Sequence, residues 1–122
     1  MKILIAFVMA GLAATSMAYG PAANLIAGYR NTGAGPFSPD AGASAWTQEH
    51  QSSSGAGTRS CASCHGTNIS KAGRHAKTGK PIEPMALSVN PARLTDAKKV
   101  EKWFRRNCRW TLGRECTPQE KG

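Results

Sequence analysis

Acidic residues are scarce in this chain of 122 residues, which has seven Asp and Glu against sixteen Lys and Arg and a formal net charge of +9. Such an excess of positive charge suits an acidic partner, and nucleic acid would be the first candidate for a cytoplasmic protein. Eight of the basic residues lie between Arg93 and Arg114, where only two residues are acidic. This segment is either a solvated helix face or a docking surface, and composition alone favours neither.

Long apolar runs are also missing beyond the N-terminus. Lys2, the apolar residues 3–14 and the small-x-small pattern at residues 16–18 predict a cleavable secretory signal over residues 1–18. The apolar run is too short to span a membrane, and no other stretch qualifies. We therefore expect an exported, periplasmic protein without a membrane span, whose residues 19–122 form one domain. Export argues against nucleic acid as the partner.

Cysteines are few, and two of the four belong to the CxxCH motif that runs from Cys61 to His65. The thiols of Cys61 and Cys64 are spaced to add to the two vinyl groups of haem, and His65 is placed to supply the proximal imidazole. The motif therefore predicts one covalently attached haem c. The alternatives are half of a zinc site and a CxxC thiol-redox pair, and neither requires the histidine.

Two short helices are expected before the motif. Residues 21–30 begin with a proline and carry apolar side chains at three- and four-residue spacing, which indicates an amphipathic helix. A second helix is expected to follow Ser38, a good N-cap, and to end near His50. Residues 51–60 show no periodicity and predict a loop. Residues 66–91 predict a long segment without regular secondary structure that runs around the haem. Contacts with the haem, rather than strand pairing, are expected to hold it in place.

The clearest helix is expected over residues 97–107, with Thr95 and Asp96 as its cap. Four residues of this helix follow the i, i+3, i+4, i+7 spacing and therefore share one face; they are Val100, Trp103, Phe104 and Asn107. This face is an apolar stripe that ends in an amide side chain. We expect Trp103 and Phe104 to belong to the core, and Trp110 to lie in a short loop after the helix.

Three segments carry a resemblance to a known family: CASCHG, KAGRHAKTGKPIEPM and VEKWFRRNCRWTLGRECTPQEK. Together they make the chain similar to the Sphaeroides haem protein family of c-type cytochromes over nearly the whole mature length. The resemblance implies a small all-α cytochrome c fold. It also implies that His65 and Asn107 bind the haem iron from opposite sides, and that Cys108 and Cys116 form a disulfide beside the asparagine.

The chain stops soon after a helix start at Thr117-Pro118, which has Glu120 at the third helical position. Members of the family continue into a C-terminal helix that packs on the helix carrying the aromatic residue equivalent to Trp46. The sequence therefore predicts that the C-terminal helix is truncated here.

The sixth iron ligand decides between two functions. An amide oxygen such as that of Asn107 is a hard, weak donor that suits ferric iron better than ferrous iron, so its loss on reduction would open a site for O2 or NO. From spacing alone, Asn107 instead ends its helix in a left-handed conformation. Met85 is the rival ligand and would make the protein a plain electron carrier, although Met also fills gaps in cores. We expect His75 to be exposed.

Cys108 and Cys116 are spaced too widely to complete a zinc site with the motif cysteines, and a disulfide is the default in an oxidising compartment. A structural role and a redox-sensitive role for this bridge both stay open. The prediction is a periplasmic monohaem cytochrome that accepts electrons and binds a diatomic gas. No defined enzyme activity follows, although an oxidoreductase side activity stays open. The resemblance implies a dihaem cytochrome c or a membrane cytochrome b as electron donor.

Overall fold

The structure is a computed structural model that describes residues 20–52, 55 and 57–122, so the signal predicted over residues 1–18 lies outside the described residues. The helices are α1 (Pro21–Asn31), α2 (Pro39–Thr47), α3 (Ala62–His65), α4 (Ala97–Leu112) and α5 (Pro118–Lys121), and the strands are β1 (His50–Gln51), β2 (Thr58–Arg59), β3 (Gly73–Arg74) and β4 (Pro81–Ile82). Within these residues, no helix combines the length and the apolar character that crossing a membrane requires.

The starts of the helices agree with the sequence predictions. Helix α2 follows Ser38, whose hydroxyl accepts a hydrogen bond of 3.1 Å from the N–H of Ala41. The N-cap of α4 is Asp96, whose carboxylate accepts a bond of 3.0 Å from the N–H of Lys99. At α5, Thr117 and Glu120 form a complete capping box. Capping depends on residues that are close in sequence, which is why it was predictable.

The end of α4 was predicted wrongly. The helix continues through Leu112, and Gly113 caps it in the left-handed conformation at φ 72° and ψ 4°. Trp110 therefore belongs to the helix and not to a loop. The interpretation in which Asn107 ends the helix is also wrong, because Asn107 lies in the interior of α4. Helix α2 ends at Thr47, slightly earlier than expected.

Short strand pairs interrupt both segments that were predicted to be irregular. The first pair is antiparallel, with His50 opposite Arg59, and the second places Gly73 opposite Ile82. The prediction of no strand pairing was wrong at these positions. Strands of two residues are too short to produce a readable alternation of apolar and polar residues, so the sequence carried no signal for them.

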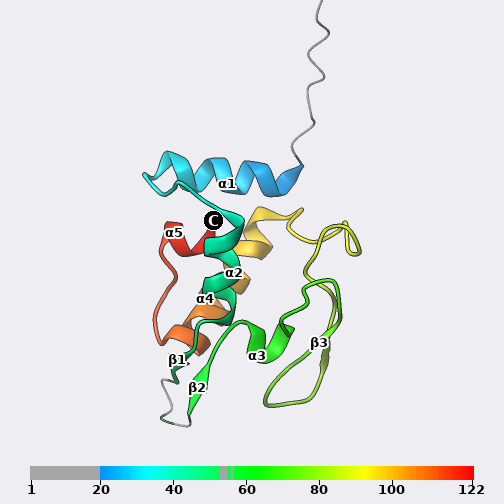
Figure 1. Cartoon of the computed structure of the whole chain (residues 1–122). Coiled ribbons are helices and arrows are strands. Elements are labelled where there is room, and N and C mark those ends of the chain that lie inside the picture. Colours follow the sequence, from blue (N-terminus) through cyan, green and yellow to red (C-terminus); the bar gives the residue numbers. More distant parts are fainter. Residues whose placement is uncertain (1–19, 53–54, 56) are drawn as a thin grey trace, which may run out of the picture.

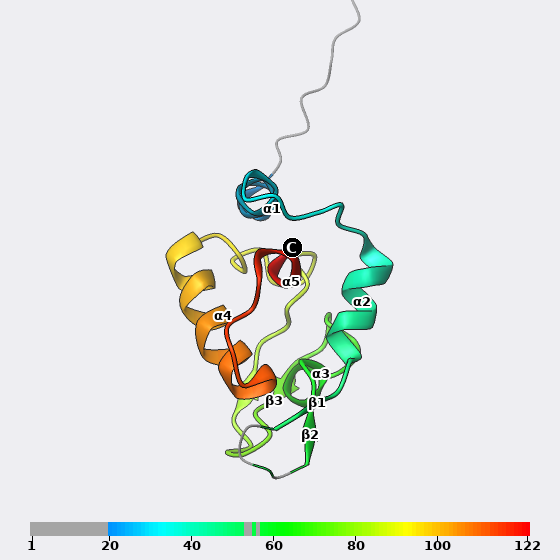
Figure 2. The same ribbon diagram turned by 90° about the vertical axis from the view of Figure 1, so that its left-hand side faces the viewer.

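The helices are arranged around the middle of the molecule (Figures 1 and 2). Helix α1 crosses one end, while α2 and α4 stand on opposite sides in Figure 2, with α5 and the C-terminus between them. Helix α3 and the strand pairs lie toward the other end. The CxxCH motif and Asn107 are therefore carried by different helices, α3 and α4.

The apolar core formed by side chains is small. Among the described residues, the buried apolar side chains are Tyr29 and Cys108, and no large side chain is less than 2% exposed. Trp103 is 44% exposed, so its predicted place in the core was wrong, whereas Phe104 is half-buried. A domain of this size normally buries a larger apolar centre. The described side chains by themselves do not supply one.

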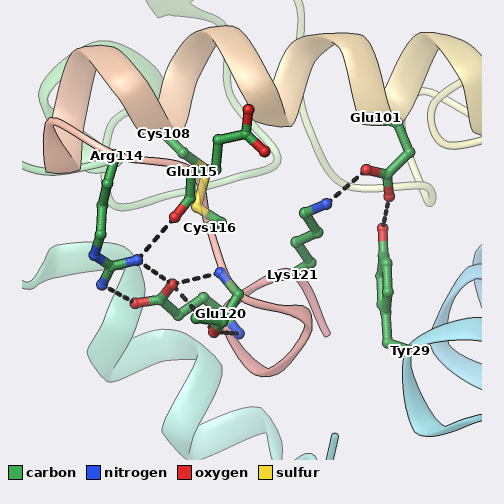
Figure 3. Close-up of a disulfide and its surroundings, with 9 residues drawn as sticks. Tyr29, Glu101, Cys108, Arg114, Glu115, Cys116, Glu120 and Lys121 are labelled. Atoms are coloured by element: carbon green, nitrogen blue, oxygen red, sulfur yellow. Dashed lines mark hydrogen bonds and ion pairs between the residues drawn. A yellow bond between two sulfur atoms is a disulfide. The ribbon is translucent and has the colours of Figure 1, made fainter. Parts of the chain in front are cut away.

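Polar contacts connect α5 to the rest of the molecule (Figure 3). Lys121 Nζ lies 2.6 Å from Glu101 Oε2 on α4, and the hydroxyl of Tyr29 on α1 donates a bond of 2.8 Å to Glu101 Oε1. The hydrogen bond from Lys121 lowers the pKa of Glu101, and burial raises the pKa of Tyr29. One carboxylate therefore joins three helices that are far apart in sequence.

Candidate functional site

The CxxCH motif forms a single helical turn. Cys61 has helical backbone angles, φ −59° and ψ −39°, and its carbonyl accepts a bond of 3.2 Å from the N–H of His65. Residues three apart on a helix lie on the same side, so the side chains of Cys61 and Cys64 share one side of the turn. Both cysteines are free. This spacing suits two thiols that react with one flat ligand.

His65 has the properties of a neutral metal ligand. Its ring is half-buried, and its buried Nδ1 atom has no hydrogen-bond partner among the described residues. Burial lowers the pKa of His65, and the positive charge of Arg93 lowers it further. Neutral imidazole is the form that binds iron, because a protonated ring nitrogen has no lone pair to offer.

Trp46 is a residue of the site whose contact with the motif the sequence did not predict. Its Nε1 donates a hydrogen bond of 2.8 Å to the carbonyl of Gly66, and its ring centroid lies 5.4 Å from that of His65. Helix α2 is thereby attached to the end of the motif turn. Trp46 precedes His65 by nineteen residues, and no local pattern could have revealed the contact.

Gly73 is a second residue that sequence reasoning missed. A Cβ atom at this position would overlap the carbonyl oxygen of Cys64 and would lie 2.7 Å from the Cα of His65. Strand β3 therefore passes directly against the motif because Gly73 has no side chain. The N–H of Ala76, just after the strand, lies 3.3 Å from the sulfur of Cys64.

Asn107 lies in the interior of α4. It is exposed, and its side chain forms no hydrogen bond within the described part of the chain. Its neighbour Cys108 is buried and forms a disulfide with Cys116 across a Cα–Cα distance of 5.5 Å. Figure 3 shows the bridge connecting α4 to the segment that leads into α5. The backbone next to Asn107 is thus held at a fixed point.

Met85 and His75 both lie on the segment between α3 and α4. Met85 is half-buried, and its N–H donates a bond of 2.9 Å to the carbonyl of Ile69. His75 is also half-buried, so the prediction that it is exposed was wrong. Its Nδ1 accepts bonds from the N–H groups of Lys77 and Thr78, and its ring centroid lies 6.2 Å from that of Trp110. The imidazole is occupied in stabilising a turn.

The site fits a covalently bound haem. The two thiols share one side of a turn, burial lowers the pKa of the imidazole that follows them, and its buried Nδ1 has no hydrogen-bond partner within the described residues. The small core agrees with a large apolar group at the centre of the domain. The large apolar side chains that are exposed within the described residues are Ile69, Leu87, Val89 and Trp103.

Known proteins agree with this interpretation. A family described as a domain of unknown function, DUF1924, matches residues 32–122. Cytochrome c-type protein SHP of Cereibacter sphaeroides is 42% identical over 99 residues, which are 81% of this chain and 75% of the relative. The chain belongs to the Sphaeroides haem protein family of c-type cytochromes. Cytochrome c'' of Methylophilus methylotrophus is 48% identical over 61 residues, 50% of this chain and 42% of the relative.

Solved structures of the family confirm the fold. The structure of oxidised SHP, described as an oxygen-binding cytochrome c, superposes with a TM-score of 0.75 and 41% identity over 84% of this chain and 88% of that chain. Oxidised cytochrome c'' of Methylophilus methylotrophus gives a TM-score of 0.73 and 35% identity over 83% and 86% of the two chains. The predicted all-α cytochrome c-type fold is confirmed. The chain is a c-type cytochrome whose cofactor is covalently bound haem c, and a zinc or thiol-redox module is no longer an alternative.

Proposed function

We propose that this c-type cytochrome accepts an electron and then binds O2 or NO at a coordination position that Asn107 leaves on reduction. Cys61 and Cys64 hold the haem, and His65 supplies the proximal ligand. The observation that carries the proposal is the position of Asn107 inside α4. It is not needed as a helix cap, and its amide has no partner in the described structure. The amide is therefore free to bind iron.

The chemistry of the amide explains why its bond would depend on the oxidation state. Haem iron supplies a one-electron couple and a position at which a diatomic gas binds. The amide oxygen of Asn107 is a hard donor and binds ferric iron in preference to the softer ferrous iron. The disulfide at Cys108 limits the movement of the backbone, so Asn107 leaves by rotation of its side chain. The relative described as an oxygen-binding cytochrome c supports O2 as the ligand.

The competing proposal is an ordinary electron carrier in which Met85 is the sixth ligand. One support is that the side chain of Met85 is half-buried. A second is that the N–H groups of Met85 and Ala86 both donate hydrogen bonds to the carbonyl of Ile69, and these bonds hold the segment in place. A thioether binds ferrous iron well, so this ligand would stay on reduction. The two proposals therefore predict different ferrous states.

Spectra of holoprotein variants test the assignment of the sixth ligand. Asn107→Ala should open the ferric iron to azide and leave NO binding by the ferrous protein intact, because the amide has already left. Met85→Leu should change neither spectrum, since a half-buried methionine tolerates an apolar residue of similar volume. Asn24→Ala, an exposed asparagine on α1, is the matched control. A low-spin ferrous protein that Met85→Leu converts to high-spin would establish the electron-carrier proposal instead.

The covalent attachment is tested separately. The double variant Cys61→Ala, Cys64→Ala should lose its haem on denaturation and extraction into acidified organic solvent, because no bond would join the haem to the chain. The wild-type protein should keep its haem under the same treatment. Full retention of haem by the double variant would rule out these two cysteines as the attachment points.

Location and electron donor belong to the same proposal. The predicted signal over residues 1–18 would export the protein to the periplasm, where the Cys108–Cys116 disulfide can form. A dihaem cytochrome c or a membrane cytochrome b would supply the electron. Sequencing the N-terminus of the protein purified from the periplasm should show a start near Tyr19.

A further inference from the structure

Helix α4 carries a continuous band of positive charge. Its members, called here the α4 basic face, are Lys98, Lys99, Lys102, Arg105, Arg106 and Arg109, and all of them are exposed. With 3.6 residues per turn, these positions lie within an arc of about 120° on the helix surface. Lys98, Lys102 and Arg109 belong to one row along the helix.

Little negative charge compensates this face. Glu115 lies 2.8 Å from Arg109 and 4.0 Å from Arg105. The carboxylate of Glu101, on the same helix, contacts Lys121 and Tyr29 instead. Within the described part of the chain, the four remaining cations of the face form no ion pair; they are Lys98, Lys99, Lys102 and Arg106.

The lysines of this face are unfavourable for the helix by itself. Like charges four residues apart on a helix repel each other, as Lys98 and Lys102 do. Lys98 and Lys99 also stand in the first turn, which contains no acidic residue, and cations are disfavoured there by the helix dipole. Stability of α4 therefore does not explain the lysines of the basic face, whereas Arg109 in the last turn suits the helix dipole.

Several arginines elsewhere have partners inside the fold. Arg114 forms two hydrogen bonds with Glu120, and Arg93 donates to the carbonyls of Glu83 and Pro84. The guanidinium of Arg30 lies 5.6 Å from the ring centroid of Phe37. On the α4 basic face, the guanidinium of Arg106 likewise lies 5.5 Å from the ring centroid of Trp103. The three lysines of the face differ from these arginines, because Lys98, Lys99 and Lys102 form no ion pair or cation–π contact within the described residues.

We infer that the α4 basic face is the docking surface for a redox protein that presents an acidic surface. The inference rests on the proposed electron-accepting function. Asn107 follows Lys98 by nine residues, which places it on roughly the opposite side of α4. A partner docked on the basic face would thus be separated from Asn107 by about the 10 Å diameter of one helix. Complementary charge speeds such encounters and orients the partner.

The rate of reduction by an acidic electron donor tests the inference. Reduced flavodoxin, a small acidic one-electron carrier, is the probe, and reduction of the holoprotein is followed by stopped-flow absorbance at low ionic strength. Lys98→Glu with Lys102→Glu should lower the second-order rate constant by about tenfold or more and weaken its dependence on salt. A glutamate at position 98 suits the first turn of α4, and glutamate at position 102 is as good a helix former as lysine, so this variant is expected to fold.

The control variant is Lys77→Glu with Lys80→Glu, which changes the net charge by the same amount on the turn between β3 and β4. These lysines are also exposed and form no ion pair among the described residues. The control should change the rate constant less than about threefold, because it leaves the docking surface intact. An equal loss in both variants would show that only net charge matters and would overturn the inference, as would a larger loss in the control.

Two further measurements distinguish protein docking from a defect at the iron and from binding to a membrane. Reduction of every variant by dithionite shows that its haem can accept an electron without a protein partner. NO binding by the ferrous form tests the proposed function, and it can fail without changing the comparison of flavodoxin rates. Sedimentation with vesicles containing phosphatidylglycerol tests a membrane as the partner. Vesicle binding that is lost in Lys98→Glu with Lys102→Glu, while the flavodoxin rate is unchanged, would overturn the inference in favour of a membrane surface. A wild-type protein that flavodoxin fails to reduce at low salt would also overturn it.

Discussion

Trp46 donates a hydrogen bond of 2.8 Å to the carbonyl oxygen of Gly66, the residue that follows His65. This contact fixes the end of the motif turn against helix α2. Trp46→Phe keeps an aromatic ring but removes the donor, and it should lower the free energy of unfolding by about 1 kcal/mol. Urea unfolding of the holoprotein measures the change. Trp103→Phe is the control, because the indole of Trp103 has no hydrogen bond in the described residues, and an equal loss there would contradict this role for Trp46.

Gly73 should not tolerate a side chain. Gly73→Ala places a methyl group against the backbone of Cys64 and His65, neither of which can move without displacing the motif. We expect a loss of about 1–3 kcal/mol in stability and a lower yield of covalent haem. The control is Gly42→Ala in α2, where a Cβ atom meets no other atom within 4 Å. That variant should be neutral or stabilising, because alanine favours a helix over glycine.

The bridge between Cys108 and Cys116 should be fully formed in the exported protein. Alkylation without a reductant, followed by mass spectrometry, should label neither thiol. The double variant Cys108→Ser, Cys116→Ser should lose about 2.5 kcal/mol, the loop-entropy value for a sequence separation of eight. The same variant tests the redox role, since a structural bridge would leave the ferric and ferrous spectra unchanged. Quantitative labelling of both thiols would disprove the bridge.

Acid should weaken the attachment of α5. The guanidinium of Arg114 holds the pKa of Glu120 at about 2, below its ordinary value of 4.5. A lowered pKa means that the carboxylate stabilises the fold above about pH 4.5, and that this contribution is lost as the pH falls toward 2. Glu120→Gln should therefore lower stability at pH 6 but change it little near pH 2. Urea unfolding at both pH values measures this difference.

The control for the acid experiment is Asp40→Asn on helix α2. Its carboxylate has no ion-pair partner in the described part of the chain. This variant should not reproduce the pH dependence of Glu120→Gln. If both variants behave alike, the effect comes from total charge and not from the Arg114–Glu120 pair.

Features set by neighbouring residues were predictable from the sequence. The helix starts at Ser38, Asp96 and Thr117 depend on side chains that bond to backbone groups three residues away. The CxxCH motif needs only one helical turn to bring its cysteines together. The family resemblance was also readable from the sequence, because short segments of neighbouring residues carry it. The comparisons confirmed the family.

Tertiary structure alone decided the features that depend on residues far apart in the chain. The contact of Trp46 with Gly66 and the approach of Gly73 to Cys64 join separate elements, and no local periodicity encodes them. The end of α4 was misjudged because residues 108–112 contain no proline or glycine, and the helix continues until Gly113 caps it. Packing of helices that are far apart in the sequence also brings Tyr29 and Lys121 to the carboxylate of Glu101. Sequence determined the chemistry of the motif, whereas packing determined which side chains surround it.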